Sequence, residues 1–193
     1  MRPIISDMTP SYKDKFFLEE IVNLRDKFQI TTLIETGTWK GHTIKGFSNH
    51  FLKCISIEYD KECYDHALEL TKNVPNIQLI HGNSVDVLRK ILHRSQMNVM
   101  FFLDAHWNDY WPLIDELQTI ADYEIKPVIA IHDFFTPDGN GGSKFEYDAY
   151  GVQALNFEYV QKKIENIYGS ENYKHYCLDR AELNRGVGFF HPI

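Results

Sequence analysis

The chain alternates between short apolar runs and longer amphipathic stretches, and this alternation predicts its secondary structure. The runs are rich in β-branched or aromatic residues, which favour strands, whereas the stretches repeat apolar residues at helical spacing. The runs cover residues 32–34, 54–57, 77–80, 99–103 and 128–131, and the stretches cover 42–51, 61–72, 85–94 and 112–123. Strands and helices that alternate in this way predict an α/β fold with a parallel sheet and helices on both faces.

The N-terminal part departs from this alternation. Residues 13–28 carry apolar side chains at helical spacing from Phe17 to Phe28, and Ser11 with Asp14 three residues later resembles a capping box. We expect residues 1–193 to form a single domain with residues 1–30 as an N-terminal helical extension. This helix could fold over the site or form a homodimer contact.

The C-terminal part predicts a different ending for the sheet. A helix over 152–168 is followed by strands at 173–178 and 187–191 with no helix between them, which indicates an antiparallel pair at the sheet edge. Residues 134–150 hold three glycines, one proline and several aromatic residues. Because long loops in compact domains are usually functional, we interpret this segment as a lid over the site.

A polar residue follows or ends each of the five predicted strands. The first four lie 23 residues apart, which matches the length of one strand–helix–loop unit; they are Glu35, Glu58, His81 and Asp104, and the fifth run ends at His132 and Asp133. The carboxyl ends of parallel strands meet at one edge of a sheet, where open α/β sheets bind ligands. The spacing therefore predicts a polar binding site at that edge.

Composition limits the classes of partner that the protein is expected to bind. The 193 residues hold 20 Lys and Arg against 27 Asp and Glu, a net charge of −7, so we expect neither nucleic-acid nor anionic-membrane binding. No apolar run reaches the ~18 residues of a membrane span, and residues 1–7 do not resemble a signal peptide. The three cysteines follow no metal-ligand spacing, which favours a reducing, cytoplasmic location.

The first strand leads into the turn Glu35-Thr-Gly37-Thr38-Trp-Lys-Gly41. Glycine lets the backbone approach a ligand closely, and the following helix presents free N–H groups there. The G-x-x-x-G spacing differs from that of dinucleotide enzymes, and an acid before it suits a ligand with an ammonium group. The alternative interpretation is a pair of glycines that serve only packing.

Glu58 ends the second strand, where a carboxylate can accept hydrogen bonds from both hydroxyls of a ribose. The alternative interpretation is an exposed acid that caps a helix. The two acids, in this order and at this spacing, point to a nucleoside ligand more strongly than either alone.

From residue 31 onward the chain resembles the class I S-adenosylmethionine-dependent methyltransferases. The resemblance rests on Glu35-x-Gly37-x-x-x-Gly41, Glu58, His81-Gly-Asn83-Ser84 and Asp104. It implies a Rossmann-like, mostly parallel seven-stranded sheet and S-adenosylmethionine as cofactor. It also implies that the first loop, including Thr38, holds the methionine part and Glu58 the ribose. By the same resemblance Asn83 and Ser84 lie on the adenine side, and Tyr59 packs on the ring.

Asp104 and Asp133, at neighbouring strand ends, are similar to the acids with which small-molecule O-methyltransferases hold a divalent cation. Oxygen ligands alone favour Mg²⁺, whereas an added histidine shifts the preference toward Mn²⁺ or Fe²⁺. The Asp-Asn pair that these enzymes carry after the fifth strand is absent, because Phe134 follows Asp133. The fourth strand also lacks the Asn-Pro-Pro-Tyr pattern of enzymes that methylate base or amide nitrogens.

His106, Asp133 and His132 are the catalytic candidates. If no metal activates the acceptor hydroxyl, we expect His106 to act as general base, because imidazole has a pKa of ~6.5, and His132 competes for this role. Either histidine could instead be satisfied by a backbone carbonyl. Trp107, Tyr110 and Trp111 form an apolar acceptor wall or a cover for the sheet edge.

These residues predict methyl transfer to an oxygen of a small molecule that resembles a sugar, a polyol or a phenol. Two other hypotheses remain open at this stage. His106, His132 and Asp133 could hold Fe²⁺ for an oxygenase, or the fold could be a non-catalytic cofactor-binding subunit.

Overall fold

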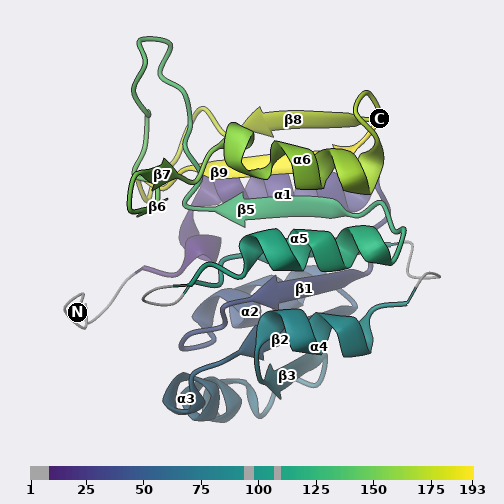
Figure 1. Cartoon of the computed structure of the whole chain (residues 1–193). Helices are drawn as coiled ribbons and strands as arrows, with labels where there is room; N and C mark the ends of the chain where they lie inside the picture. Colours follow the sequence, from purple (N-terminus) through teal and green to yellow (C-terminus); the bar gives the residue numbers. More distant parts are fainter. Residues whose placement is uncertain (1–8, 94–97, 107–109) are drawn as a thin grey trace.

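The strands form one seven-stranded sheet in the order β3-β2-β1-β4-β5-β9-β8 (Figure 1). A computed structural model of the chain describes residues 9–93, 98–106 and 110–193. Strands β1 to β5 are parallel, and β9 pairs antiparallel with both β5 and β8. The bounds are β1 Thr32–Thr36, β2 Lys53–Glu58, β3 Ile77–His81, β4 Val99–Leu103, β5 Val128–His132, β8 Tyr173–Cys177 and β9 Val187–Pro192. The predicted α/β fold with an antiparallel closing pair is confirmed.

Six α-helices are present in the described part of the chain, and they flank the sheet on both faces. Helices α4, α5 and α6 share one apolar cluster with the sheet, and α1 and α2 share the other. Their bounds are α1 Lys15–Lys27, α2 His42–Phe47, α3 Lys61–Thr71, α4 Ser84–Ile91, α5 Leu113–Asp122 and α6 Phe157–Tyr168. None of these helices is both long enough and apolar enough to span a membrane.

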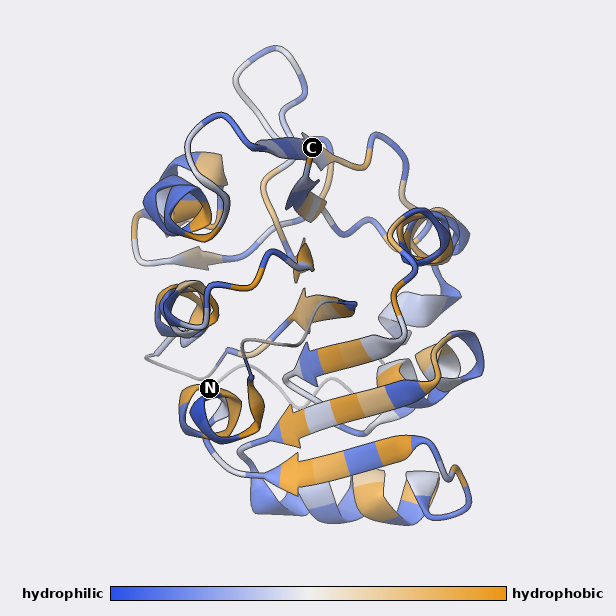
Figure 2. Ribbon diagram, turned by 90° about the vertical axis from the view of Figure 1, so that its right-hand side faces the viewer, coloured by the Kyte–Doolittle hydropathy of each residue, from blue (hydrophilic) through white to orange (hydrophobic). Residues whose placement is uncertain are grey.

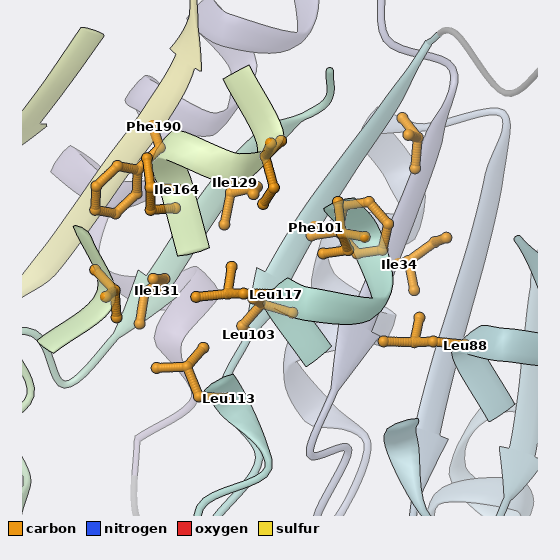
Figure 3. Packing of buried hydrophobic residues seen from close by; sticks show 14 of the residues in the cluster. Ile34, Leu88, Phe101, Leu103, Leu113, Leu117, Ile129, Ile131, Ile164 and Phe190 are labelled. Carbon is orange, nitrogen blue, oxygen red and sulfur yellow. The ribbon is translucent and has the colours of Figure 1, made fainter. Parts of the chain in front are cut away.

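Alternate residues of the central strands fill the two faces. Ile34, Phe101 and Ile129 pack with the helices of one face (Figure 3), and their sequence neighbours Leu33 and Phe102 pack on the other. Because both faces are covered, the central strands are apolar along most of their length, as the hydropathy colouring shows (Figure 2). The core thereby holds the strand ends, and the polar residues beyond them, in fixed register.

Three local boundaries differ from the sequence prediction. Asp14, not Ser11, caps α1: its carboxylate accepts hydrogen bonds from the N–H groups of Phe16 and Phe17, whereas Ser11 begins a short 3₁₀ turn, Ser11–Lys13. A second 3₁₀ turn, Ser48–His50, follows α2. Helix α6 begins at Phe157 rather than 152, because the extended Asn156 caps it, and the residues before it form a two-stranded sheet, β6 Ala149–Tyr150 and β7 Gln153–Ala154.

Candidate functional site

A cavity of about 480 Å³ lies at the carboxyl edge of the sheet, over the ends of β2, β1, β4 and β5. The residues before α1 and those between β8 and β9 close its remaining sides, through Ser11, Leu183 and Arg185 among others. Seven of the residues predicted from the sequence line it: Gly37, Thr38, Glu58, Asp104, His106, His132 and Asp133. The polar residues that the sequence predicts at one edge of the sheet therefore line the same cavity.

Gly37 allows the ends of β1 and β4 to approach. Its φ is +83°, and a Cβ there would lie 2.6 Å from the carbonyl oxygen of Asp104. Gly41 is also left-handed, at φ +80°, but it does not line the cavity. A Cβ on Gly41 would lie 2.8 Å from the Cβ of Ala67, so this glycine lets α2 pack against α3, as in the packing interpretation.

Glu58 stands at the cavity wall with its carboxylate held in place. One carboxylate oxygen accepts a hydrogen bond from the N–H of Trp39 at 2.6 Å, and the other accepts one from the N–H of Asp60 at 2.8 Å. Burial raises the pKa of Glu58, and the surrounding backbone N–H groups oppose this rise by stabilising the ionised form. The end of β2 thus presents a carboxylate in a fixed position that can accept hydrogen bonds from a ligand.

Glu35 lies behind the first loop rather than in the cavity. It is 1 % exposed, and its carboxylate accepts a hydrogen bond from the Ser56 hydroxyl at 2.5 Å. The same hydroxyl lies 2.5 Å from that of Thr38, which does line the cavity. Burial raises the pKa of Glu35 well above its usual range. Glu35 therefore supports the loop through Ser56.

The residues predicted for the adenine side do not line the cavity. Asn83 caps α4 by accepting hydrogen bonds from the N–H groups of Val85 and Asp86, and Ser84 is buried. The side chain of Tyr59 is 54 % exposed at the end of β2. Their roles toward an adenine stay predictions.

Asp104, His106 and Asp133 form a cluster that could hold a metal ion. Their ligand atoms lie within 4.8 Å of one another. Asp133 follows β5 with φ +53°, which is uncommon for a residue other than glycine and costs about 1–3 kcal/mol. Strained backbone of this kind gathers at functional sites, and here it belongs to a residue of the cluster.

His132 lies between the two acids of this cluster. Its Nδ1 is 3.3 Å from Oδ1 of Asp104 and 3.3 Å from Oδ1 of Asp133, and its Nε2 is 3.2 Å from the Ser11 hydroxyl. Burial lowers the pKa of His132, but the two carboxylates outweigh burial and raise this pKa well above its usual range. The two carboxylates therefore favour the protonated form of His132, which is a poor arrangement for a base or a ligand.

Asp133 is held ionised by its neighbours. Burial acts to raise its pKa, but the positive charges of His132 and Arg185 lower it to about 2. By contrast, the side chain of His106 is 44 % exposed, with its Nε2 3.9 Å from Oδ2 of Asp148. Of the two candidate bases, His106 is the more exposed, since the side chain of His132 is only 9 % exposed.

The predicted lid segment, residues 134–150, approaches the site near its end, where Oδ2 of Asp148 lies 3.9 Å from Nε2 of His106, and its role as a lid stays a prediction. None of the residues 134–150 lines the 480 Å³ cavity. Phe134 is fully buried, and the segment after it forms a hairpin that extends beyond the sheet (Figure 1). Trp107 lies outside the described residues. Tyr110 donates a hydrogen bond to Asp115, and Trp111 packs against Tyr150 and Tyr159, so these two rings are not part of the cavity wall.

Sequence reasoning missed several residues of the cavity wall. Trp39, His42 and Thr43 extend the first loop into α2, and they follow directly from the turn whose glycines were recognised. Ser11 and Arg185 come from the two ends of the chain. The antiparallel closing strands were the available signal for Arg185, because pairing of β9 with β5 brings the residues before Val187 beside those after His132.

The fold of this chain was compared with those of known proteins. No family model matches the chain, and no curated protein matches it. Solved structures do. The methyltransferase PaMTH1 of Podospora anserina, solved with SAH bound, superposes with a TM-score of 0.62 at 12 % identity over 90 % of this chain and 76 % of that one. The fold is that of the class I methyltransferases.

Two further structures show that this methyltransferase fold does not itself define the acceptor. A caffeoyl-CoA O-methyltransferase candidate from Staphylococcus aureus matches with a TM-score of 0.61 at 15 % identity, over 93 % of this chain and 84 % of its own. An rRNA methylase from Streptococcus thermophilus matches with a TM-score of 0.59 at 10 % identity, over 97 % and 99 %. At these identities the shared property is the fold.

Proposed function

We propose that the protein transfers a methyl group from S-adenosylmethionine to an oxygen of a small molecule, with a divalent cation, Mg²⁺ or Mn²⁺, at the acceptor. A sugar, a polyol or a phenol fits this class. The observation that carries the proposal is that one cavity joins Glu58 at the end of β2 to the Asp104–His106–Asp133 cluster at the ends of β4 and β5.

The cofactor end fits S-adenosylmethionine. A cavity of about 480 Å³ falls within the ~300–1,000 Å³ of ordinary ligand sites. An ionised carboxylate offers about four acceptor positions, and the N–H groups of Trp39 and Asp60 use two of those on Glu58. The remaining two suit the paired hydroxyls of a ribose. The Podospora protein and the N-terminal domain of EvdMO1, which share the fold, were both solved with SAH bound.

The other end fits a divalent cation. Two carboxylates and one imidazole form a donor set suited to Mn²⁺ or Mg²⁺. Arg185 and His132 both contact Asp133 through Oδ1, which leaves Oδ2 for a ligand bond. A bound divalent cation would lower the pKa of an acceptor hydroxyl and so favour the nucleophilic alkoxide.

The chain's own residues supply position and proton transfer. The sulfonium is already activated, so the protein has to align the acceptor oxygen, the methyl carbon and the sulfur. The bond from carbon to oxygen forms as the bond from carbon to sulfur breaks, and the hydroxyl proton leaves. Without a cation, His106 accepts this proton. With one, His106 would complete the ligand set, and the hydroxyl proton would pass to solvent water. His106→Gln separates the two roles, because it weakens Mn²⁺ binding only in the second.

The net charge of the chain favours a small molecule over RNA as the methyl acceptor, although rRNA methylases share the fold. The chain has a net charge of −7, and a protein that binds RNA normally gains its affinity from basic side chains on phosphates. The cluster that could hold a metal consists of Asp104, His106 and Asp133 and does not include His132, which argues against an oxygenase that uses His106, His132 and Asp133. A non-catalytic subunit would bind cofactor and still transfer no methyl group.

The test is a calorimetric titration of wild-type protein with S-adenosylhomocysteine and then with Mn²⁺, in chelator-treated buffer. We expect both ligands to bind, and Asp133→Asn to weaken Mn²⁺ binding at least about tenfold while the affinity for S-adenosylhomocysteine stays within twofold. Asp179→Asn, whose side chain is 77 % exposed in the loop after β8, is the matched control and should change neither. Equal Mn²⁺ affinity in wild type and Asp133→Asn contradicts the cation site.

A further inference from the structure

Arg185 is a fixed positive charge in the wall of the cavity. Among the described lining residues it is the only lysine or arginine. Its Nη1 donates a hydrogen bond to Oδ1 of Asp133 at 3.0 Å, and its Nε lies 3.7 Å from Oε2 of Glu146. Nη1 also lies 4.0 Å from Oδ1 of Asp148. These contacts with described residues involve Nη1 and Nε and not Nη2. The three carboxylates thus anchor the group while part of its fork stays available.

The backbone around Arg185 is held as firmly as its side chain. Glu146 pairs with the loop on both sides of Arg185: its N–H donates to the carbonyl of Asn184 at 2.9 Å, and its carbonyl accepts from Gly186 at 3.0 Å. Farther along the same loop, Oδ2 of Asp14 accepts hydrogen bonds from the N–H groups of Glu182 and Leu183, at 2.6 and 2.9 Å. These hydrogen bonds join the start of α1 to the loop before β9, and we call the joined segment, Asp14 with residues 182–186, the clasp.

This clasp stands at the acceptor end of the cavity. Glu58 ends β2 and Asp133 follows β5, three strand positions away, which is roughly 14 Å at the usual strand spacing. Arg185 contacts Asp133, so it lies at the end opposite the ribose acid, beside the proposed cation ligands. Leu183 and Ser11 line the same end. A group bound there would belong to the acceptor rather than to the ribose or adenine.

We infer that the acceptor of this enzyme carries an anionic group, a carboxylate or a phosphate, and that Arg185 binds it. The inference rests on the proposed function and specifies its substrate class as a hydroxylated acid. Arginine suits this role because its planar fork forms charge-assisted hydrogen bonds with carboxylate and phosphate oxygens. Asp133 and Glu146 hold the fork in place before the acceptor arrives, which reduces the entropy lost on binding.

The experiment measures binding to protein saturated with S-adenosylhomocysteine and Mg²⁺. The probes are two matched pairs: 3,4-dihydroxybenzoate with 3,4-dihydroxybenzamide, and glucuronate with glucose. We expect the anion of at least one pair to bind about 10- to 100-fold more tightly than its neutral counterpart, as for a hydrogen bond to a charged group. In Arg185→Gln that ratio should fall to about one, and Arg185→Lys should keep part of it.

Controls separate the possible failures. Arg180→Gln removes an exposed arginine from the same loop and should leave the ratio unchanged. Equal affinity within both pairs, no binding of either anion at millimolar concentration, or a ratio that survives in Arg185→Gln overturns the inference. A tenfold loss of S-adenosylhomocysteine affinity in Arg185→Gln also overturns it, because Arg185 would then bind the cofactor's own carboxylate. Failure of the wild type to bind S-adenosylhomocysteine overturns the proposed function itself, a separate result.

Discussion

A buried carboxyl group on α5 should make the protein less stable as the pH rises from about 4.5 toward neutrality. Glu116 is fully buried, and neither of its carboxylate oxygens has a partner at hydrogen-bond geometry. The buried hydroxyls of Thr36 and Ser84 lie near it and favour ionisation slightly, but burial dominates and raises the pKa of Glu116 from 4.5 to about 7.

The sign and size of the effect follow from proton linkage. Between pH 4.5 and about 7 the folded protein keeps a proton on Glu116 that the unfolded chain has lost. Stability therefore falls as pH rises through this window, by about 3 kcal/mol in total at ~1.36 kcal/mol per pKa unit. Glu116→Gln keeps the shape of the side chain and removes the titration. The variant should match wild type near pH 4.5 and exceed its stability by about 3 kcal/mol at about pH 8.

Urea unfolding followed by circular dichroism at about pH 5, 6, 7 and 8 measures this difference. Glu19→Gln, an exposed position on α1, is the control and should change stability by less than about 0.5 kcal/mol at every pH. A stability difference between Glu116→Gln and wild type that stays constant across this range refutes the reasoning. So does a variant less stable than wild type at about pH 8.

Three other predictions rest on single contacts. Gly37→Ala should destabilise the fold by at least about 2 kcal/mol in urea unfolding, because a left-handed residue gains a Cβ against the Asp104 carbonyl; a loss below about 0.5 kcal/mol, the level of an ordinary surface substitution, contradicts the close approach. Asp14→Ala should cost about 2–4 kcal/mol, since its carboxylate accepts four backbone hydrogen bonds, and a neutral effect would count against the clasp. Cys54, buried and with its pKa raised to about 12, should stay unmodified by iodoacetamide in the native protein, as mass spectrometry of digests will show; rapid labelling contradicts its burial.

The sequence predicted the sheet and its binding edge because both depend on short-range patterns. Parallel register follows from the apolar runs, so equal spacing places the polar ends of β1, β2 and β4 side by side. Glu58, Asp104 and Asp133 meet in one cavity for this reason. The glycine turn was visible as well, although only the structure shows that Gly37 borders the cavity while Gly41 packs against Ala67.

What the sequence could not show depends on contacts between distant segments. Arg185 reaches Asp133 only because β9 inserts between β5 and β8. Asp14 caps α1 with one carboxylate oxygen, and its other oxygen binds the loop before β9, a contact over 168 residues that no local pattern shows. Composition predicts residues 134–150 as a lid, but only the structure shows that Phe134 is buried in the core and that Glu146 reaches Arg185.

The central claim is that Glu58 holds the ribose of S-adenosylmethionine, and calorimetric titration with S-adenosylhomocysteine tests it most directly. Wild-type protein should bind this product. Glu58→Gln should bind it at least about tenfold more weakly, as expected for the loss of hydrogen bonds to a charged group, while Glu62→Gln, an exposed neighbour on α3, should bind as wild type does. No binding by the wild type at millimolar ligand, or equal affinity in Glu58→Gln, would contradict the account.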